Sequence, residues 1–222
     1  MVIPIFFRNQ NIPQNPRVML SFEIKNNKNI TEWCTELSLL LNENNITATI
    51  FFPGKLVEQN PTILNIFEKG IDIGSQTYNY VNISSLDFTT QLNEIKKGKQ
   101  IIDQKGNLNS QIFKAPYGET DENIYYLLTQ NNITADFSYQ TQFNLYENGQ
   151  FIKYEAITSE NTIASIKTSL NILENHQLLI IPFENTDLIQ DITEIILELK
   201  KFGIQFLNAS DLAGTDLTGR GE

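Results

Sequence analysis

Residues 45–80, NITATIFFPGKLVEQNPTILNIFEKGIDIGSQTYNY, decide the expected fold because they hold one complete strand, helix and strand unit. The short apolar run Thr47–Phe52 predicts a buried strand. Asn60 before Pro61 predicts a helix start, since asparagine caps helices and proline suits the first turn. A second apolar run follows at Ile71–Gly74. Two strands connected through a helix predict a parallel pair.

The same alternation continues from Arg17 to Leu212. Further strands are predicted at Val18–Ile24, Ile112–Lys114, Thr134–Ser138, Leu178–Phe183 and Ile204–Leu207, which gives seven strands. Helices are predicted to begin at Thr120 and Ser159, and a last helix at Leu188–Lys201 is ended by Gly203. Seven repeats without a strong linker favour an α/β fold with a closed or nearly closed (β/α) barrel, although the pattern leaves an open sheet possible.

The chain divides into three parts on these patterns. Residues 1–16 are expected to form an N-terminal extension, 17–212 the barrel, and 213–222 a flexible tail rich in glycine. Residues 140–158 are polar and turn-rich, and they predict a long loop or hairpin above the barrel mouth.

Charge and composition exclude several classes of partner. The formal net charge of -10 disfavours nucleic acid and anionic lipid surfaces. The apolar runs are far shorter than the roughly 20 residues that span a bilayer. A single cysteine, Cys34, permits no intrachain disulfide and is expected to be a packing residue. The first residues lack a signal-peptide pattern, which favours a cytoplasmic location.

Several ordered segments resemble the polysaccharide deacetylases that carry a NodB homology domain. The segments are 45–52, Gly54-Lys55, Asn60-Pro61, Glu68-Lys69-Gly70, 73–80, 113–118 and 203–212. The resemblance extends from about Val18 to Leu212. It implies a distorted (β/α) barrel of about seven parallel strands, activity on N-acetylated polysaccharide and an extracellular or cell-surface location.

The family's metal-binding residues are replaced in this chain. Where the family has Thr-Phe-Asp-Asp, with a general base and then a metal ligand, this sequence has Ser21-Phe22-Glu23-Ile24. The two histidine ligands of the family, four residues apart, correspond to Gln76 and Tyr80. An alkyl group, an amide and a phenol cannot replace a carboxylate and two imidazoles, so the resemblance implies that zinc or another divalent metal is lost.

Two further family positions are also changed. The arginine that orients the catalytic carboxylate corresponds to Lys114, which keeps the charge but loses the two-pronged guanidinium. The late histidine that serves as general acid aligns with Pro182 or Phe183, and neither can carry a proton. His176, the one histidine of the chain, precedes the predicted strand Leu178–Phe183 and is expected at the opposite end of the barrel from the mouth.

The predicted C-terminal ends of the strands still place polar and aromatic side chains at the barrel mouth. Candidate substrate-binding residues are Gln76, Tyr80, Lys114, Tyr117 and Tyr139, and the carboxylates there are Glu23, Asp136 and Glu184. Tyrosines flanked by polar groups suit carbohydrate, because rings pack on the apolar face of a sugar. Equally, the tyrosines can simply cap the barrel while Lys114 neutralises Glu23 or Asp136.

Three functions follow. The favoured one is a pseudoenzyme without metal or catalysis that binds an N-acetylated glycan or a protein partner. The alternative is an active hydrolase or deacetylase that uses Glu23 or Asp136 as base and Glu184 as acid without the usual metal site. The third is a metal-dependent deacetylase with an oxygen-only site built from these carboxylates and Gln76.

Overall fold

The computed structural model describes residues 15–139, 141–174 and 177–219, and within them nine strands form one sheet. The strands are β1 (Arg17–Glu23), β2 (Ala48–Phe52), β3 (Ile71–Ser75), β4 (Ile112–Phe113), β5 (Ala135–Asp136), β6 (Gln142–Glu147), β7 (Gln150–Thr158), β8 (Leu178–Glu184) and β9 (Gln205–Phe206). The helices are α1 (Ile30–Glu43), α2 (Gly54–Gln59), α3 (Phe88–Gly106), α4 (Ile124–Gln130), α5 (Ile163–Ile172), α6 (Ile189–Lys200) and α7 (Ala209–Ala213). Three short 3-10 turns lie between them at η1 (Ile63–Ile66), η2 (Ile83–Ser85) and η3 (Pro116–Gly118).

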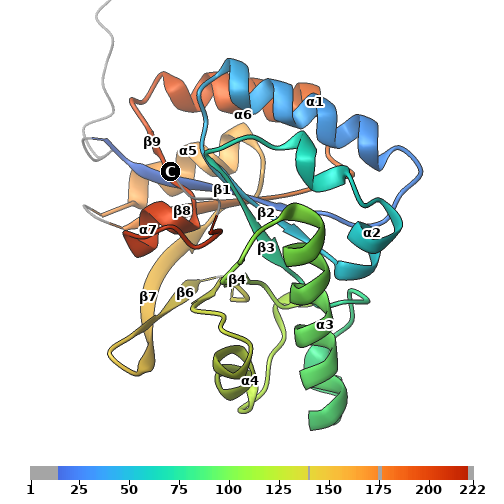
Figure 1. Ribbon diagram of the computed structural model, residues 1–222. Helices are drawn as coiled ribbons and strands as arrows, with labels where there is room; N and C mark the ends of the chain where they lie inside the picture. The colour runs from blue at the N-terminus through green and yellow to red at the C-terminus, as the bar shows by residue number, and fades with distance from the viewer. Residues whose placement is uncertain (1–14, 140, 175–176, 220–222) are drawn as a thin grey trace, which may run out of the picture.

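The sheet closes on itself into a distorted barrel of eight strands, β1 to β8, because β1 pairs with both β2 and β8. The strands are parallel except around β6, which runs antiparallel to both neighbours. The short strand β9 pairs with the beginning of β1. Figure 1 shows α1 and α6 side by side over one side of the barrel. The predicted α/β barrel is therefore confirmed, with eight strands in place of seven.

The additional wall of the barrel is the β6–β7 hairpin, in the segment predicted as a loop or hairpin above the mouth. Its two-residue turn is Asn148-Gly149, with φ of 50° and 91°. Two successive positive φ values suit a tight hairpin between twisted strands. Phe143 and Leu145 alternate inward into the barrel core, so the hairpin closes the barrel as well as bordering the mouth.

Apolar residues are buried on both sides of the barrel wall. Residues inside it, such as Met19 and Phe51, form one buried cluster, while Phe22 and Ile24 point outward into a larger cluster beneath the helices. This alternation along β1 is the ordinary consequence of the period of two in a strand. The same alternation decides which residues of each strand point into the barrel, where the residues at the C-terminal end can face the mouth.

Several helix starts differ from the sequence predictions. Asn60 ends α2, and a 3-10 turn follows Pro61 where a helix was predicted. The predicted caps Thr120 and Ser159 are wrong because α4 begins at Ile124 and α5 is capped by Thr162. The last predicted helix agrees closely with α6.

The segment after α7, for which the sequence predicts a flexible tail, packs against the barrel as far as residue 219. Leu217 is buried, and its carbonyl accepts a hydrogen bond from the backbone N–H of Gln111. The three-part division of the chain otherwise stays a prediction, since residues 1–14 lie outside the described part. In the part that is described, each helix is too short or too polar to cross a bilayer.

Candidate functional site at the barrel mouth

A pocket of about 240 Å³ opens at the C-terminal ends of the strands. It is lined by residues from β1, β7 and β8 and from the loops after β1, β3, β4 and β5: Ser21, Glu23, Lys25, Tyr80, Lys114, Tyr117, Gly118, Phe137, Ser138, Tyr139, Thr158, Ile180, Pro182 and Glu184. This is the position at which barrel enzymes place their active sites. The pocket is therefore the candidate functional site.

Two ion pairs cross this pocket. Lys114 Nζ lies 2.7 Å from Glu23 Oε1, and both side chains are largely buried. Lys25 Nζ lies 2.5 Å from Glu184 Oε1, and these two side chains are more exposed. Glu23 and Glu184 are register partners at the ends of neighbouring strands. The mouth therefore carries two acidic and two basic groups that neutralise each other.

Aromatic rings form one side of the entrance. The rings of Tyr80 and Tyr117 meet edge to face with centroids 5.4 Å apart, and Lys25 Nζ lies 5.7 Å from the Tyr80 ring centroid. Burial raises the pKa of Tyr80 well above its ordinary value, and the nearby Glu23 and Glu184 carboxylates raise it further. Tyr117 is 63% exposed. Tyr80 is thus a neutral phenol, and Tyr117 offers a ring surface to solvent.

The loop after β3 holds Tyr80 in place. Thr77 and Tyr80 both have φ near 60°, a conformation that is unusual for residues with side chains. Glu94 on α3 accepts hydrogen bonds from the backbone N–H groups of Tyr78 and Asn79. Because one buried carboxylate satisfies both donors, the loop is fixed against α3.

Gln76 lies behind the pocket, although the sequence suggested a substrate-binding role. Its side chain is fully buried, and its Nε2 donates to the carbonyl oxygens of Ile24 at 2.6 Å and Phe51 at 3.0 Å. The amide therefore connects the ends of β1 and β2 to the end of β3. Gln76 does not line the pocket, because a side chain at a strand end can point into the barrel wall as readily as into the mouth.

Asp136 is also withdrawn from the pocket. It is fully buried and accepts hydrogen bonds from the backbone N–H and the hydroxyl of Ser138 and from Asn144 Nδ2. Burial raises the pKa of Asp136 to about 6, and the hydrogen bonds from Ser138 oppose this shift. The carboxylate joins β5 to β6 and does not line the pocket. Sequence position at a strand end could not reveal this orientation.

Most of the other residues selected from the sequence meet in the pocket. Glu23, Tyr80, Lys114, Tyr117, Tyr139 and Glu184 all line it. Of the two residues aligned with the family's late histidine, Pro182 lines the pocket, whereas Phe183 is buried in the outer core. His176 lies outside the described residues.

Sequence reasoning missed Lys25 and Ser21. Lys25 comes two residues after Glu23 at the end of the strand, and that position was the available signal for a residue at the mouth. Ser21 faces inward for the same reason as Glu23, since residues two apart on a strand share a face. Both line the pocket.

The side chains present offer few ligands for a metal ion. Ile24 is packed in the outer core, and Tyr80 has a raised pKa that disfavours the phenolate. The Gln76 Nε2 is bound to the main chain, and its buried Oε1, which has no hydrogen-bond partner among the described residues, is a neutral amide oxygen. Among the residues that the structure describes, no group of three His, Cys, Asp or Glu side chains is placed to hold a metal. The side chains at the three ligand positions therefore do not fit the zinc ion that the family resemblance implies.

Comparison with known proteins identifies a curated relative by sequence and several solved structures by fold. A stretch of 93 residues, 41% of this chain, is 30% identical to a peptidoglycan-N-acetylglucosamine deacetylase of Bacillus cereus. That stretch spans 34% of the Bacillus enzyme, so the chain covers about a third of the length of this curated relative.

Solved structures share the fold. A family 4 carbohydrate esterase from Streptomyces lividans superposes with a TM-score of 0.64 at 19% identity, covering 87% of this chain and 93% of that one. A family 4 pseudoenzyme from Bacillus anthracis superposes with a TM-score of 0.66 at 15% identity, covering 92% of this chain and 67% of that one.

The sequence profile of the polysaccharide deacetylases matches residues 10–135, which is more than half of the chain. This range includes β1 to β4 and therefore Glu23, Gln76, Tyr80 and Lys114. The match and the shared barrel lead to one conclusion: the chain belongs to the polysaccharide deacetylase family.

Proposed function

We propose that this protein is a non-catalytic member of its family that binds an N-acetylated glycan at the barrel mouth. The observation that carries the proposal is the position of the Gln76 side chain, which is fully buried and whose Nε2 donates to two main-chain carbonyl groups. In the family that the sequence resembles, a histidine that binds the metal occupies this position. Here it has become part of the barrel wall.

The metal chemistry of the family supplies two effects, polarisation of the acetamide carbonyl and a lowered pKa of the attacking water. Ile24 offers no lone pair and Tyr80 is a neutral phenol, so the remaining ligand positions do not compensate for Gln76. Loss of all three donors supports binding without deacetylation.

The pocket supports glycan recognition in another way. Its two ion pairs leave no large net charge, and the rings of Tyr80 and Tyr117 stand at the entrance. A neutral sugar presents hydroxyl and amide groups to polar side chains and C–H faces to rings. The peptidoglycan deacetylase of Bacillus cereus, by its name, acts on such N-acetylated sugars, which favours the same class of ligand here.

Metal-free hydrolysis has weaker support. Glu23 is ion-paired with Lys114 and Glu184 with Lys25, so both carboxylates at the mouth are already engaged. A general acid needs a carboxyl group with a raised pKa that reaches the substrate. Asp136 has the raised pKa but is fully buried.

One set of measurements tests the proposal. Purified protein is titrated with zinc, assayed for acetate release from N-acetylglucosamine tetramers, and tested for tetramer binding by calorimetry. We expect no stoichiometric zinc, no acetate and measurable affinity. Tyr80→Ala and Tyr117→Ala should each weaken binding by about two- to twelvefold, since one ring contact contributes about 0.5–1.5 kcal/mol.

Tyr146→Ala is the matched control, because Tyr146 is also partly exposed but lies on β6 outside the pocket. Acetate release that EDTA abolishes would overturn the proposal. Turnover that survives EDTA and disappears in Glu23→Gln would support the metal-free hydrolase instead. Unchanged affinity in both tyrosine variants would show that the glycan binds elsewhere.

A further inference from the structure

The pocket continues below the two ion pairs into the barrel. Ser21 lines it and lies two residues before Glu23 on β1, which places it about 7 Å deeper at about 3.3 Å per residue. Its register partner on β8 is Pro182, just as Glu184 is the partner of Glu23. The pocket therefore reaches a second layer of the barrel interior.

This deeper layer is hollow because its side chains are short. Ser21, Thr158 and Pro182 line the pocket at a level where large branched residues commonly fill a barrel. Phe137 and Ile180 supply the apolar part of the wall. A small ligand with an apolar middle part and polar groups at its two ends would fit this lining.

The pocket is closed at its lower end. Met19 and Leu178 fill the barrel interior below Ser21, together with other members of the same buried cluster such as Leu207. Access to Ser21 is therefore from the mouth. A ligand must enter with one end first to reach it.

The Ser21 hydroxyl has no hydrogen-bond partner among the described residues, and the residue is only 1% exposed. Buried polar groups in folded proteins are nearly always paired, and each exception calls for an explanation. An unpaired hydroxyl lining a blind pocket is explained if a ligand or its bound water supplies the partner.

Size limits what can enter. The pocket volume of about 240 Å³ lies below the range of about 300–1,000 Å³ typical of sites for drug-sized molecules. One sugar unit matches that volume, whereas several consecutive units would have to remain outside. The mouth ion pairs add no strong preference for a charged ligand.

We infer that the pocket takes a single terminal sugar of a glycan end-on, with the Ser21 hydroxyl hydrogen-bonded to its leading polar group. This inference rests on the proposed glycan binding at the same mouth and specifies its ligand as a chain end. On this inference, internal units of a long polymer do not reach Ser21.

The first test is the dependence of affinity on chain length. N-acetylglucosamine, its dimer, its tetramer and its hexamer are compared by calorimetry on the full chain. End-on binding predicts that affinity changes by less than about threefold from dimer to hexamer, and that the dimer displaces the hexamer completely. A steep rise in affinity through the hexamer would show that the chain lies across the mouth and would contradict the inference.

The second test is a pair of matched substitutions, Ser21→Ala and Ser75→Ala. Ser75 on β3 is also 1% exposed, and its hydroxyl has no hydrogen-bond partner within the described part of the chain, but it does not line the pocket. Both variants remove an unsatisfied group and should fold as well as the wild-type protein. Ser21→Ala should weaken dimer binding by about three- to tenfold while Ser75→Ala leaves it unchanged.

Ser21→Val probes the same position by filling the space. It should reduce dimer affinity more than Ser21→Ala, with an unfolding temperature that shows the barrel intact. Equal affinities for wild type, Ser21→Ala and Ser21→Val would overturn the end-on inference. If Tyr80→Ala still weakened binding in that case, the proposed function would stand, whereas absence of glycan binding to the wild-type protein would remove both.

Discussion

Lys114 and Glu23 form an ion pair across the barrel mouth, with Nζ 2.7 Å from Oε1 and both side chains mostly shielded from solvent. The pair connects the end of β1 to the loop after β4. It also places an ammonium group inside the pocket in which the family resemblance implies a metal ion.

Breaking this pair should leave one poorly solvated charge. Lys114→Met and Glu23→Gln are each expected to lower the free energy of unfolding by about 1–3 kcal/mol, because removal of one partner leaves the other without compensation. The double variant should recover part of the loss. Urea denaturation of the four proteins gives the coupling energy. Additive losses in the double variant would show that the two charges do not interact in solution.

The ion pair illustrates how far sequence reasoning reached at this site. The sequence placed Glu23 and Lys114 at the C-terminal ends of their strands, and their structural pairing was one of the alternatives it allowed. It could not show that Gln76 and Asp136 turn away from the pocket. The orientation of these two side chains depends on hydrogen-bond partners from other strands, Ile24 and Phe51 for Gln76 and Asn144 for Asp136.

Gln76 should matter for stability and not for ligand binding. Gln76→Ala removes donors from two main-chain carbonyl groups and leaves a cavity, so the free energy of unfolding should fall by about 2–4 kcal/mol. Gln76→Met keeps the volume and should cost less. Glycan affinity of Gln76→Met, measured below its unfolding temperature, should equal that of the wild-type protein. A loss of affinity larger than in Tyr80→Ala would place Gln76 back among the binding residues.

The fold was predicted more completely than the site, for a physical reason. Buried parallel strands such as β2 and β8 are continuous apolar runs, which stand out in a sequence. The β7 strand is largely exposed, and β6 buries the polar Asn144 between Phe143 and Leu145, so the apolar positions of this hairpin were hidden among polar residues. The sequence left a loop or a hairpin open for residues 140–158, and the Asn148-Gly149 pair was the signal that could have favoured the hairpin.

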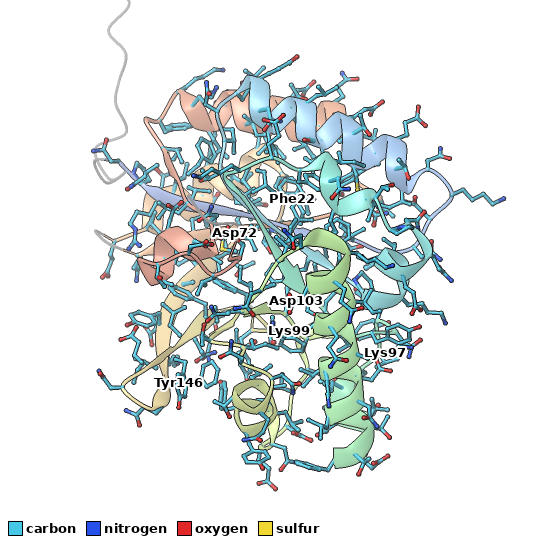
Figure 2. All side chains as sticks on the ribbon, in the orientation of Figure 1. Phe22, Asp72, Lys97, Lys99, Asp103 and Tyr146 are labelled. Carbon is cyan, nitrogen blue, oxygen red and sulfur yellow. The ribbon has the colours of Figure 1, made fainter. Side chains whose placement is uncertain are left out.

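A buried carboxylate at the other end of the barrel should make stability depend on pH. Asp72 lies beside α7 (Figure 2) and accepts a hydrogen bond of 2.7 Å from the backbone N–H of Ser210. Burial raises the pKa of Asp72 from 3.8 to about 6, while the bond from Ser210 opposes the shift. The folded state therefore binds the proton more tightly than the unfolded state does.

The sign of the effect follows from that difference. The contribution of Asp72 to stability is present below pH 3.8 and is lost as the pH rises through about 6. Asp72→Asn should therefore stabilise the protein at pH 7.5, by on the order of 1–2 kcal/mol, and the advantage should shrink at pH 4.5. Thermal unfolding at both pH values measures this, with the exposed Glu155→Gln as control. A constant difference between Asp72→Asn and wild type at both pH values would refute the assignment.

Gly98 on α3 connects helix packing to the position of Tyr80. A Cβ at Gly98 would lie 2.6 Å from the carbonyl carbon and oxygen of Thr77, at the start of the loop that carries Tyr80. In an isolated helix, replacing glycine by alanine stabilises by about 1 kcal/mol. The steric conflict with a main-chain group should reverse this gain, because overpacking costs about 1–3 kcal/mol.

Gly98→Ala is therefore expected to lower the unfolding temperature and, by displacing the loop from Thr77 to Tyr80, to weaken glycan binding as well. Lys96→Ala, an exposed substitution on the same helix, serves as the control and should change neither property. Thermal unfolding and calorimetric titration with the N-acetylglucosamine dimer measure the two effects on the same samples. A Gly98→Ala protein more stable than wild type would mean that α3 and this loop are not in close contact. Reduced stability with unchanged affinity would mean that the loop keeps Tyr80 in position without the support of α3.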